Sequence, residues 1–216
     1  MGDRSFEDLR RDYAGAPLDE AAAGDDPMAL FGAWFDQAVA AEIPLANAVA
    51  LATVGADGQP SARMVLLKGW DARGFVFYTG YDSRKGRDLL QHEPRAALLF
   101  YWEALHRQVR IEGRCAPVAA GDSDAYFSTR PRASNLSAMA SAQSQPVGSR
   151  AELERAVADL DAASAGRTLE RPAEWGGFRL RPARLEFWQG REDRLHDRLQ
   201  YDRDASGGWT RVRLCP

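Results

Sequence analysis

The sequence predicts a mainly β protein with peripheral helices, an α+β fold built on an antiparallel barrel. Predicted strands come first, helical pieces are inserted over 120–161, and strands return toward the C-terminus. This order lacks the regular alternation of strands and helices that a parallel, doubly wound sheet requires. Closing an antiparallel sheet into a barrel also removes exposed sheet edges, so a barrel is the architecture we expect.

Polar residues rich in Ala, Gly and Asp occupy the start of the chain, and we expect a flexible N-terminal segment over 1–25. Ser5 is expected to cap a short helix over 5–13, and the composition of 15–27 is typical of a linker. The remainder, 26–216, is expected to form a single domain.

The first strong element is an amphipathic helix over 26–42. Asp26 is placed to cap it, because an aspartate oxygen accepts free N–H groups of the first turn, and Pro27 suits the first helical position. One apolar stripe is predicted to face the core. Its members are Leu30, Trp34 and Ala38, with Phe31 and Phe35 beside them.

Alternating apolar residues separated by turn residues predict an antiparallel meander after this helix. The strands are expected at 47–54, 61–70, 75–80, 95–102 and 107–118, with a short helix from Ser83 between the third and fourth. Helical pieces over 120–161 are expected to break at 130–132 and 145–149, where RPR and QPVGS stand. Four further strands carry GGFRLRP, RLEFWQG, DRLHDRLQYDR and GWTRVRLCP.

Bulk composition excludes several classes of protein. Hydrophobic residues make up 45% and charged residues 27%, and the formal net charge is −3, which disfavours nucleic-acid binding through bulk electrostatics. Cys115 and Cys215 form neither a disulfide scaffold nor a CxxC motif, and the three histidines have no metal-ligand spacing, so no metal site is expected. Without a long apolar run or a signal-peptide core, we expect a soluble cytoplasmic protein with no membrane partner.

The segment EDRLHDRLQY, 192–201, concentrates potential positive charge. In an extended strand Arg194, His196 and Arg198 share one face, because successive side chains alternate. Such a face favours an anion or an electron-rich ring opposite it. The alternative is a solvated edge strand whose arginines pair with nearby carboxylates.

No GxGxxG or P-loop motif occurs, but YDSRKGRDLL, 81–90, suggests another phosphate site. Asp82 or Ser83 is placed to cap a helix, and three cations, Arg84, Lys85 and Arg87, crowd its first turn. Cations are disfavoured there by the helix dipole, and a bound phosphate would compensate for this. The alternative is that these side chains point to water or pair with neighbouring aspartates.

A second phosphate site is predicted in YFSTRPRASNLSAMASAQSQ, 126–145. Tyr126 and Arg130 share a helix face, and Ser134 is placed to cap the next helix. The alternative is a helix–turn–helix with solvent-facing arginines. Elsewhere, Arg63 and Lys68 end a strand, where they serve two anions on opposite faces or are brought together by a bulge. The alternative is that both strand ends reach solvent. Trp188 is either a core residue or a cofactor platform.

The series RMVLLK, FVFYTGYDSRKG, RQVRIEG, YFSTRPRAS, QSQ, EFWQGREDRLHDR and RLCP closely resembles the pyridoxine/pyridoxamine 5'-phosphate oxidase family. Their order and spacing match from residue 9 to Pro216. The resemblance implies an antiparallel, Greek-key-like, FMN-binding split β-barrel. It also implies a homodimer with FMN at the subunit interface.

The resemblance also implies roles for particular residues. The expected FMN contacts, some of them from the partner subunit, are Arg63, Met64, Val65, Leu66, Leu67, Lys68, Tyr78, Thr79, Arg84, Lys85, Gln108, Gln143, Ser144, Trp188 and Arg198. The expected substrate contacts are Lys68, Tyr126, Arg130 and Ser134 at the phosphate, Arg194 and His196 at the ring, and a mobile lid of Arg10, Arg11, Asp12 and Tyr13. Arg194 and His196 are the expected catalytic residues.

The implied reaction oxidises pyridoxamine or pyridoxine 5'-phosphate to pyridoxal 5'-phosphate in vitamin B6 biosynthesis or salvage. O2 is the acceptor, hydrogen peroxide is released, and the amine substrate also gives ammonia. One stretch departs from the family pattern, since Asn135, Ser137 and Met139 stand where Gln, Gly and Trp are expected. Two alternatives therefore remain, a related phenazine-type oxidase of secondary metabolism and a non-catalytic flavin-binding protein.

Overall fold

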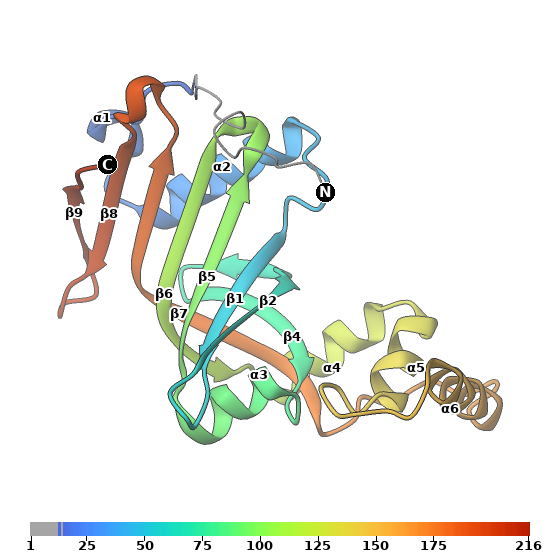
Figure 1. The fold of residues 1–216 in the computed structure, drawn as a ribbon. Helices are drawn as coiled ribbons and strands as arrows, with labels where there is room; N and C mark the ends of the chain where they lie inside the picture. The colour runs from blue at the N-terminus through green and yellow to red at the C-terminus, as the bar shows by residue number, and fades with distance from the viewer. Residues whose placement is uncertain (1–12, 14) are drawn as a thin grey trace, which may run out of the picture. The chain divides into compact units, whose positions relative to one another are not determined.

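The computed structural model describes residue 13 and residues 15–216, and its strands form a single hydrogen-bonded sheet. The strand order is β2-β1-β5-β6-β7-β4-β3, with β8 beside β7 and β9 beside β8 (Figure 1). The strands are β1 Ala48–Val54, β2 Pro60–Leu66, β3 Gly69–Asp71, β4 Gly74–Gly80, β5 Arg95–Trp102, β6 Arg107–Pro117, β7 Trp175–Gln189, β8 Asp197–Arg203 and β9 Trp209–Arg213.

The helices come mostly between the strands, as the sequence predicts. They are α1 Glu20–Ala23, α2 Pro27–Ala40, α3 Arg84–Arg87, α4 Ala120–Thr129, α5 Arg132–Ala140 and α6 Arg150–Ala163. A π-helical turn, Asp88–His92, continues α3, and short 3-10 turns stand at Glu103–Leu105 and Glu192–Arg194. Among the residues that the structure covers, no helix is long and apolar enough to cross a lipid bilayer.

The chain divides into two compact units. The first consists of the described residues up to Val49 together with Leu98–Glu112 and Ala183–Pro216, and the second of Ala50–Ala97 and Gly113–Pro182. Whether 26–216 behaves as one domain stays a prediction.

The core of the first unit forms where α2 packs on the sheet. Asp26 accepts the N–H of Met28 and Pro27 begins the helix, as predicted. Phe31 lies 5.3 Å from Phe100 between ring centroids, and Trp34 meets Phe187 edge-on. The predicted apolar stripe is thus confirmed as the face that α2 buries.

The core of the second unit forms between β4 and β7. The two strands are antiparallel, and Phe77 stands opposite Phe178 with their rings stacked 5.8 Å apart. Helices α5 and α6 lie side by side in this unit, where Arg132 donates to Asp161 (Figure 1). The expected helix breaks at 130–132 and 145–149 are confirmed.

Three local predictions were wrong. The strand expected over 61–70 ends at Leu66, because Leu67 turns into the core and the Lys68 N–H pairs with Val76 before β3 starts. The strands expected from GGFRLRP and RLEFWQG form one continuous strand, β7, which passes through Pro182. The expected linker over 15–27 contains α1, capped by Asp19.

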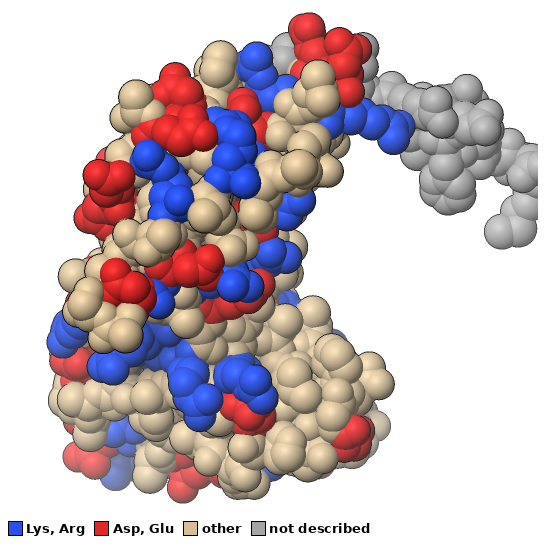
Figure 2. Space-filling view, turned by 90° about the vertical axis from the view of Figure 1, so that its left-hand side faces the viewer, with Lys and Arg blue, Asp and Glu red and all other residues tan. Residues whose placement is uncertain are grey.

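Figure 2 shows Lys and Arg side chains interspersed with Asp and Glu over the face that it presents. Many of these charges pair with one another, such as Arg184 with Asp202 and Arg213 with Glu20. Exposed pairs of this kind contribute little to stability because water screens them.

Glycines at two places allow opposite predictions about stability. A Cβ on Gly86 would lie 2.1 Å from the Tyr81 carbonyl oxygen, whereas a Cβ on Gly32 in α2 would meet nothing within 4 Å. We expect Gly86→Ala to destabilise the protein by about 1–3 kcal/mol through overpacking. Gly32→Ala is expected to stabilise it by about 0.5–1 kcal/mol, because alanine favours helix. Urea unfolding measures the stability of both variants. A Gly86→Ala variant as stable as the wild type would contradict the close approach of Gly86 to the Tyr81 carbonyl.

Candidate functional site

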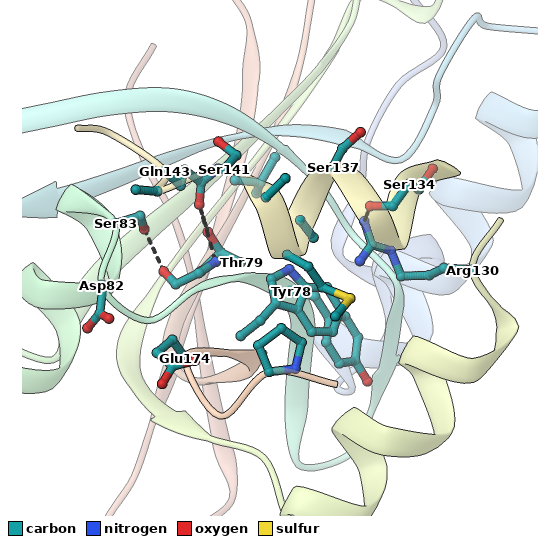
Figure 3. Close-up of a pocket in the computed structure, with 18 of the residues that line it drawn as sticks. Tyr78, Thr79, Asp82, Ser83, Arg130, Ser134, Ser137, Ser141, Gln143 and Glu174 are labelled. Carbon is teal, nitrogen blue, oxygen red and sulfur yellow. Dashed lines mark hydrogen bonds between the residues drawn. The ribbon is translucent and has the colours of Figure 1, made fainter. Parts of the chain in front are cut away.

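A pocket of about 930 Å³ lies within the second unit. Its walls come from β2, β4, the start of α3, α4, α5 and the segment after α5, and Figure 3 shows part of this lining. It brings together many residues that the sequence predicts at one site. They are Met64, Val65, Leu66, Lys68, Tyr78, Thr79, Lys85, Tyr126, Arg130, Ser134 and Gln143.

One end of the pocket contains a buried lysine. Lys85 is 8% exposed, and its Nζ donates to the Thr79 hydroxyl at 3.0 Å and the Ser83 hydroxyl at 3.4 Å. Among the described residues no carboxylate lies within 4.0 Å of this ammonium, although Asp82 and Glu174 also line the pocket. Desolvation, with the nearby charge of Arg63, lowers the pKa of Lys85 to about 8.

The turn that carries Lys85 is fixed by local hydrogen bonds. Ser83 caps α3, as predicted, by accepting the N–H of Gly86 at 3.2 Å. The three cations of this turn differ in their surroundings. Lys85 lines the pocket, Arg84 is exposed and does not line it, and Arg87 donates to the carbonyl of Asp82.

Gln143 joins the segment after α5 to the lysine end. Its Oε1 accepts the Thr79 hydroxyl at 2.9 Å and the Gly80 N–H at 3.2 Å. The neighbouring Ser144, also predicted at the site, does not line the pocket and has a positive φ of 72°.

The other end of the pocket contains a guanidinium. Arg130 donates through Nη2 to the backbone carbonyl of Ser134 at 3.1 Å, while its Nη1 is buried without a hydrogen-bond partner. Burial lowers the pKa of Arg130. The prediction that Ser134 caps the following helix was wrong, because α5 begins at Arg132 and Pro131 occupies the cap.

Stacked rings lie between the two ends. Tyr78 stacks on Tyr126 with centroids 3.9 Å apart and on Trp175 at 5.5 Å. The Arg130 guanidinium carbon lies 4.6 Å from the Trp175 ring centroid, a cation–π contact. Figure 3 shows Thr79 with Gln143 on one side of Tyr78 and Arg130 with Ser134 on the other. The pocket therefore has two polar ends and an aromatic middle.

Arg63 is held behind this pocket by a polar network. Its Nη1 donates to the Thr53 hydroxyl at 2.7 Å, and that hydroxyl donates to the buried Asp88 at 2.6 Å. Neither Arg63 nor Leu67 lines the pocket, and Leu67 is buried in the core. Met64 and Leu66 lie on the opposite face of β2 from Arg63, but Val65, which shares the Arg63 face, also lines the pocket, so the alternation of β2 alone does not keep Arg63 out of the lining.

A separate cluster of rings lies in the first unit. Tyr13 meets His106, Trp188 and His196 edge-on, with centroids 5.0, 5.5 and 5.4 Å away. Trp188 and His196 are themselves 4.7 Å apart. Trp188 is thus half-buried against polar rings. The other expected lid residues, Arg10, Arg11 and Asp12, lie outside the described residues.

The basic segment does not form the strand that the sequence predicts. Asp193 and Arg194 have positive φ values of 53° and 59° in a short turn, and β8 begins only at Asp197. Arg194, His196 and Arg198 therefore do not share one strand face. Non-glycine residues in this left-handed region cost free energy, and such costs concentrate at functional sites.

The hydrogen bonding of His196 fixes its tautomer. Its Nδ1 accepts the backbone N–H of Arg191 at 3.1 Å, so the proton of the neutral ring sits on Nε2. Desolvation, with the charge of Arg194, lowers the pKa of His196. Both features favour the neutral form of the ring, in which Nε2 carries the hydrogen.

Three residues predicted at the flavin lie on strands of the first unit. Trp188 on β7 stands opposite Arg198 on β8, and Gln108 belongs to β6. Arg198 donates through Nε to the buried carboxylate of Glu186 at 2.8 Å. Their contribution to a ligand site stays a prediction.

The three residues that depart from the family pattern lie in α5. Ser137 and Met139 line the pocket. Asn135 is buried and donates to the carbonyl of Phe127, while its Oδ1 has no hydrogen-bond partner. The departure therefore changes both the pocket wall and the packing behind it.

Three residues that contact the predicted set were not expected from the sequence. Trp175 makes a cation–π contact with Arg130. Asp88 accepts the Thr53 hydroxyl of the Arg63 network, and Glu186 accepts a hydrogen bond from Arg198. A tryptophan before a strand is usual in a core, and the carboxylates pair with residues distant in sequence. Only Asp88, beside the basic turn, had a signal that sequence reasoning could have used.

Comparison with known families matches both parts of the chain. The family model described as pyridoxamine 5'-phosphate oxidase matches residues 35–163. A second, described as the pyridoxine 5'-phosphate oxidase C-terminal dimerisation region, matches residues 175–216 and indicates a homodimer.

Curated relatives match almost the whole chain. The pyridoxine/pyridoxamine 5'-phosphate oxidase of Rubrobacter xylanophilus is 55% identical over 99% of this chain and 97% of its own length. The protein of the same name from Bordetella petrii is 57% identical over 98% of this chain and 100% of its own.

Solved structures share the fold. PhzG from Burkholderia lata, in complex with tetrahydrophenazine-1-carboxylic acid, has a TM-score of 0.87 and 33% identity, covering 94% of this chain and all of its own. An FMN-binding protein from Nostoc punctiforme, described as related to pyridoxamine 5'-phosphate oxidase, has a TM-score of 0.70 at 19% identity. The predicted antiparallel split-barrel fold is confirmed. The chain therefore belongs to the pyridoxamine 5'-phosphate oxidase family of oxidoreductases, and this membership implies a flavin cofactor.

Proposed function

We propose that the protein is an FMN-dependent oxidase that converts pyridoxamine or pyridoxine 5'-phosphate to pyridoxal 5'-phosphate. O2 accepts two electrons and two protons and leaves as hydrogen peroxide. With the amine substrate, oxidation gives an imine, and water hydrolyses it to the aldehyde and ammonia. The proposal places the protein in vitamin B6 biosynthesis or salvage. The names of the curated relatives support the same activity.

One observation carries the proposal: the pocket has two cationic ends that have no carboxylate partner among the described residues, and stacked aromatic rings separate them. Lys85 contacts only hydroxyls at one end, and Arg130 keeps a buried Nη1 without a partner at the other. Buried cations are costly unless an anion compensates them. Two phosphorylated aromatic molecules, a flavin mononucleotide and a B6 vitamer, supply that compensation, so the residues present fit this cofactor.

In this proposal Lys85 and Arg84 hold the FMN phosphate, and Arg63 adds positive charge behind them. The segment from Arg63 to Lys68, with Tyr78, Thr79 and Gln143, runs along the flavin. The family resemblance adds Ser144, Gln108, Trp188 and Arg198, some of them from the partner subunit of a homodimer.

The substrate phosphate is assigned to the other end of the pocket. Arg130 offers its unpartnered Nη1, and the Tyr126 hydroxyl and Ser134 side chain are the neutral donors there. Lys68 lines the same pocket with its Nζ 6.0 Å from the Tyr126 ring centroid. A guanidinium with hydroxyl donors suits a phosphate dianion.

FMN, when bound, supplies the redox chemistry: it accepts electrons from the 4' carbon of the substrate and returns them to O2. Arg194 is proposed to position that carbon. It is not assigned the role of base, because the pKa of an arginine lies above about 12. His196 is proposed to donate its Nε2 hydrogen to a ring substituent of the substrate, since Nδ1 is already occupied.

A related oxidase of a tricyclic phenazine-type donor is the second candidate. Two observations favour it: the likeness to PhzG, and the replacement of an expected tryptophan by Met139 in the pocket wall. Arg130, which lines the same pocket, favours a phosphorylated donor instead. Donor tests distinguish these two oxidases from a non-catalytic flavin-binding protein.

We expect the purified protein to be yellow and its flavin absorbance to bleach anaerobically on adding pyridoxamine 5'-phosphate. Admitting O2 should restore the colour and give one peroxide per turnover. Unphosphorylated pyridoxamine is the matched control and should bleach it far more slowly. Bleaching only by a dihydrophenazine carboxylate supports the second candidate, and no bleaching with any donor supports the non-catalytic one.

Two variants separate the proposed cofactor and catalytic roles. Lys85→Ala should lower the amount of FMN that copurifies, because the buried ammonium is lost. Arg194→Ala should lower turnover by about a hundredfold or more while leaving flavin content near that of the wild type. Flavin absorbance against protein concentration, with steady-state peroxide production, measures both. Equal flavin content in Lys85→Ala and wild type contradicts the phosphate assignment.

The lowered pKa of Lys85 predicts a pH dependence of FMN binding. Below about 8 the ammonium is charged in the free protein, and above it the amine is increasingly neutral. A bound phosphate favours the charged form, so FMN affinity should fall as the pH rises through about 8. Fluorescence titration of FMN measures this, and Lys85→Arg, which stays charged, should remove the dependence. A flat wild-type profile would contradict the assignment.

A further inference from the structure

Glu186 on β7 is a buried carboxylate held between two guanidinium groups. It is 2% exposed, and all three side chains belong to the first unit. Its Oε1 accepts Arg198 Nε at 2.8 Å, with Nη2 of the same guanidinium 2.7 Å away. Its Oε2 accepts Nη2 of Arg110. Both oxygens are therefore used, one for each arginine.

Strand register explains why these groups meet. Trp188 stands opposite Arg198 in the antiparallel pairing of β7 and β8. Glu186 lies two residues before Trp188 and so shares its face of the strand. On β6, Arg110 shares a face with Gln108 in the same way. Glu186 is thus on the face that carries Gln108, Trp188 and Arg198.

Hydrogen bonds to the C-terminal segment also hold Arg198 in place. Its Nη1 donates to the backbone carbonyl of Cys215 at 2.8 Å, and its own carbonyl accepts the Leu214 N–H at 2.9 Å. The side chain is still 26% exposed on this face. The guanidinium plane is therefore set by Glu186 and the C-terminal segment before any ligand arrives.

We propose that Glu186 is a positioning residue that orients Arg198 for contact with the isoalloxazine of FMN. The inference rests on the proposed function, which assigns Arg198 to the flavin. Without the carboxylate, Arg198 loses the charge-assisted hydrogen bond of its Nε and the ion pair of its Nη2, and it faces the repulsion of Arg110. Its guanidinium then samples other rotamers, and part of the binding free energy goes to ordering it again.

The test is a double-mutant cycle on FMN release. Holoprotein is diluted, and the rise in free-flavin fluorescence gives the dissociation constant for wild type, Glu186→Gln, Arg198→Gln and the double variant. Glutamine keeps the shape of Glu186 but removes its charge. We expect Glu186→Gln to weaken binding about tenfold. In the Arg198→Gln background the same substitution should change binding less than about twofold.

Glu112→Gln is the matched control. Glu112 contacts Arg110 and Arg184 on the same strand face but is 39% exposed and does not contact Arg198. It should leave the FMN dissociation constant within about twofold of the wild type. Thermal unfolding of each apoprotein is measured in parallel. If Glu186 has a purely structural role, Glu186→Gln should lower the stability of the apoprotein and weaken FMN binding equally with Arg198 and with Gln at position 198.

The outcomes separate this inference from the proposed function. If the two substitutions have additive effects on the free energy of FMN binding, Glu186 does not act through Arg198 and the positioning role is overturned. The assignment of Arg198 to the flavin is then unaffected. No effect of Arg198→Gln on FMN binding removes Arg198 from the flavin site and overturns the inference with it. If Glu186→Gln does not fold, Glu186→Asp, which keeps the charge but shortens the reach, is measured in its place. Unchanged FMN release from that variant likewise overturns the inference.

Discussion

The burial of Lys85 without a carboxylate partner is the constraint on which the proposed site depends. A desolvated ammonium that contacts only hydroxyls is unfavourable in the free protein, and its lowered pKa expresses that cost. The turn tolerates it because Ser83 caps α3 and Gly86 lets the chain pass close to the Tyr81 carbonyl. Free energy spent on holding the cation is recovered when an anion binds.

At the other end of the pocket, Arg130 also has a buried polar atom without a hydrogen-bond partner among the described residues, and its guanidinium is stabilised differently. Here an aromatic ring replaces the hydroxyls, since Trp175 lies under the guanidinium and stacks with Tyr78. The stacked rings of Tyr78, Tyr126 and Trp175 lie between the two ends. This arrangement is the reason for proposing flat, phosphorylated molecules as the occupants of the pocket.

In the first unit, orientation is set by hydrogen bonds from backbone and buried carboxylates. The Arg191 N–H fixes the His196 tautomer, and Glu186 holds Arg198. These partners carry no chemistry of their own. They remove rotational freedom from the side chains that are proposed to face the ligand, which is a general way in which sites gain affinity and precision.

The sequence by itself determined the fold class, the α2 helix and its buried stripe, the Ser83 cap and the residues whose motifs resemble the family. These depend on periodicity, capping and short motifs, which are local properties of the chain. Only the tertiary structure decided that Arg194 lies in a left-handed turn rather than a strand, that Ser134 follows a cap at Pro131, and that Glu186 meets both Arg110 and Arg198. The Glu186 contacts join residues on three different strands, so strand register rather than any local pattern fixes them. The turn at Arg194 and the cap at Pro131 are local, but the sequence allowed a strand and a Ser134 cap equally well, and the choice was made only in the folded chain.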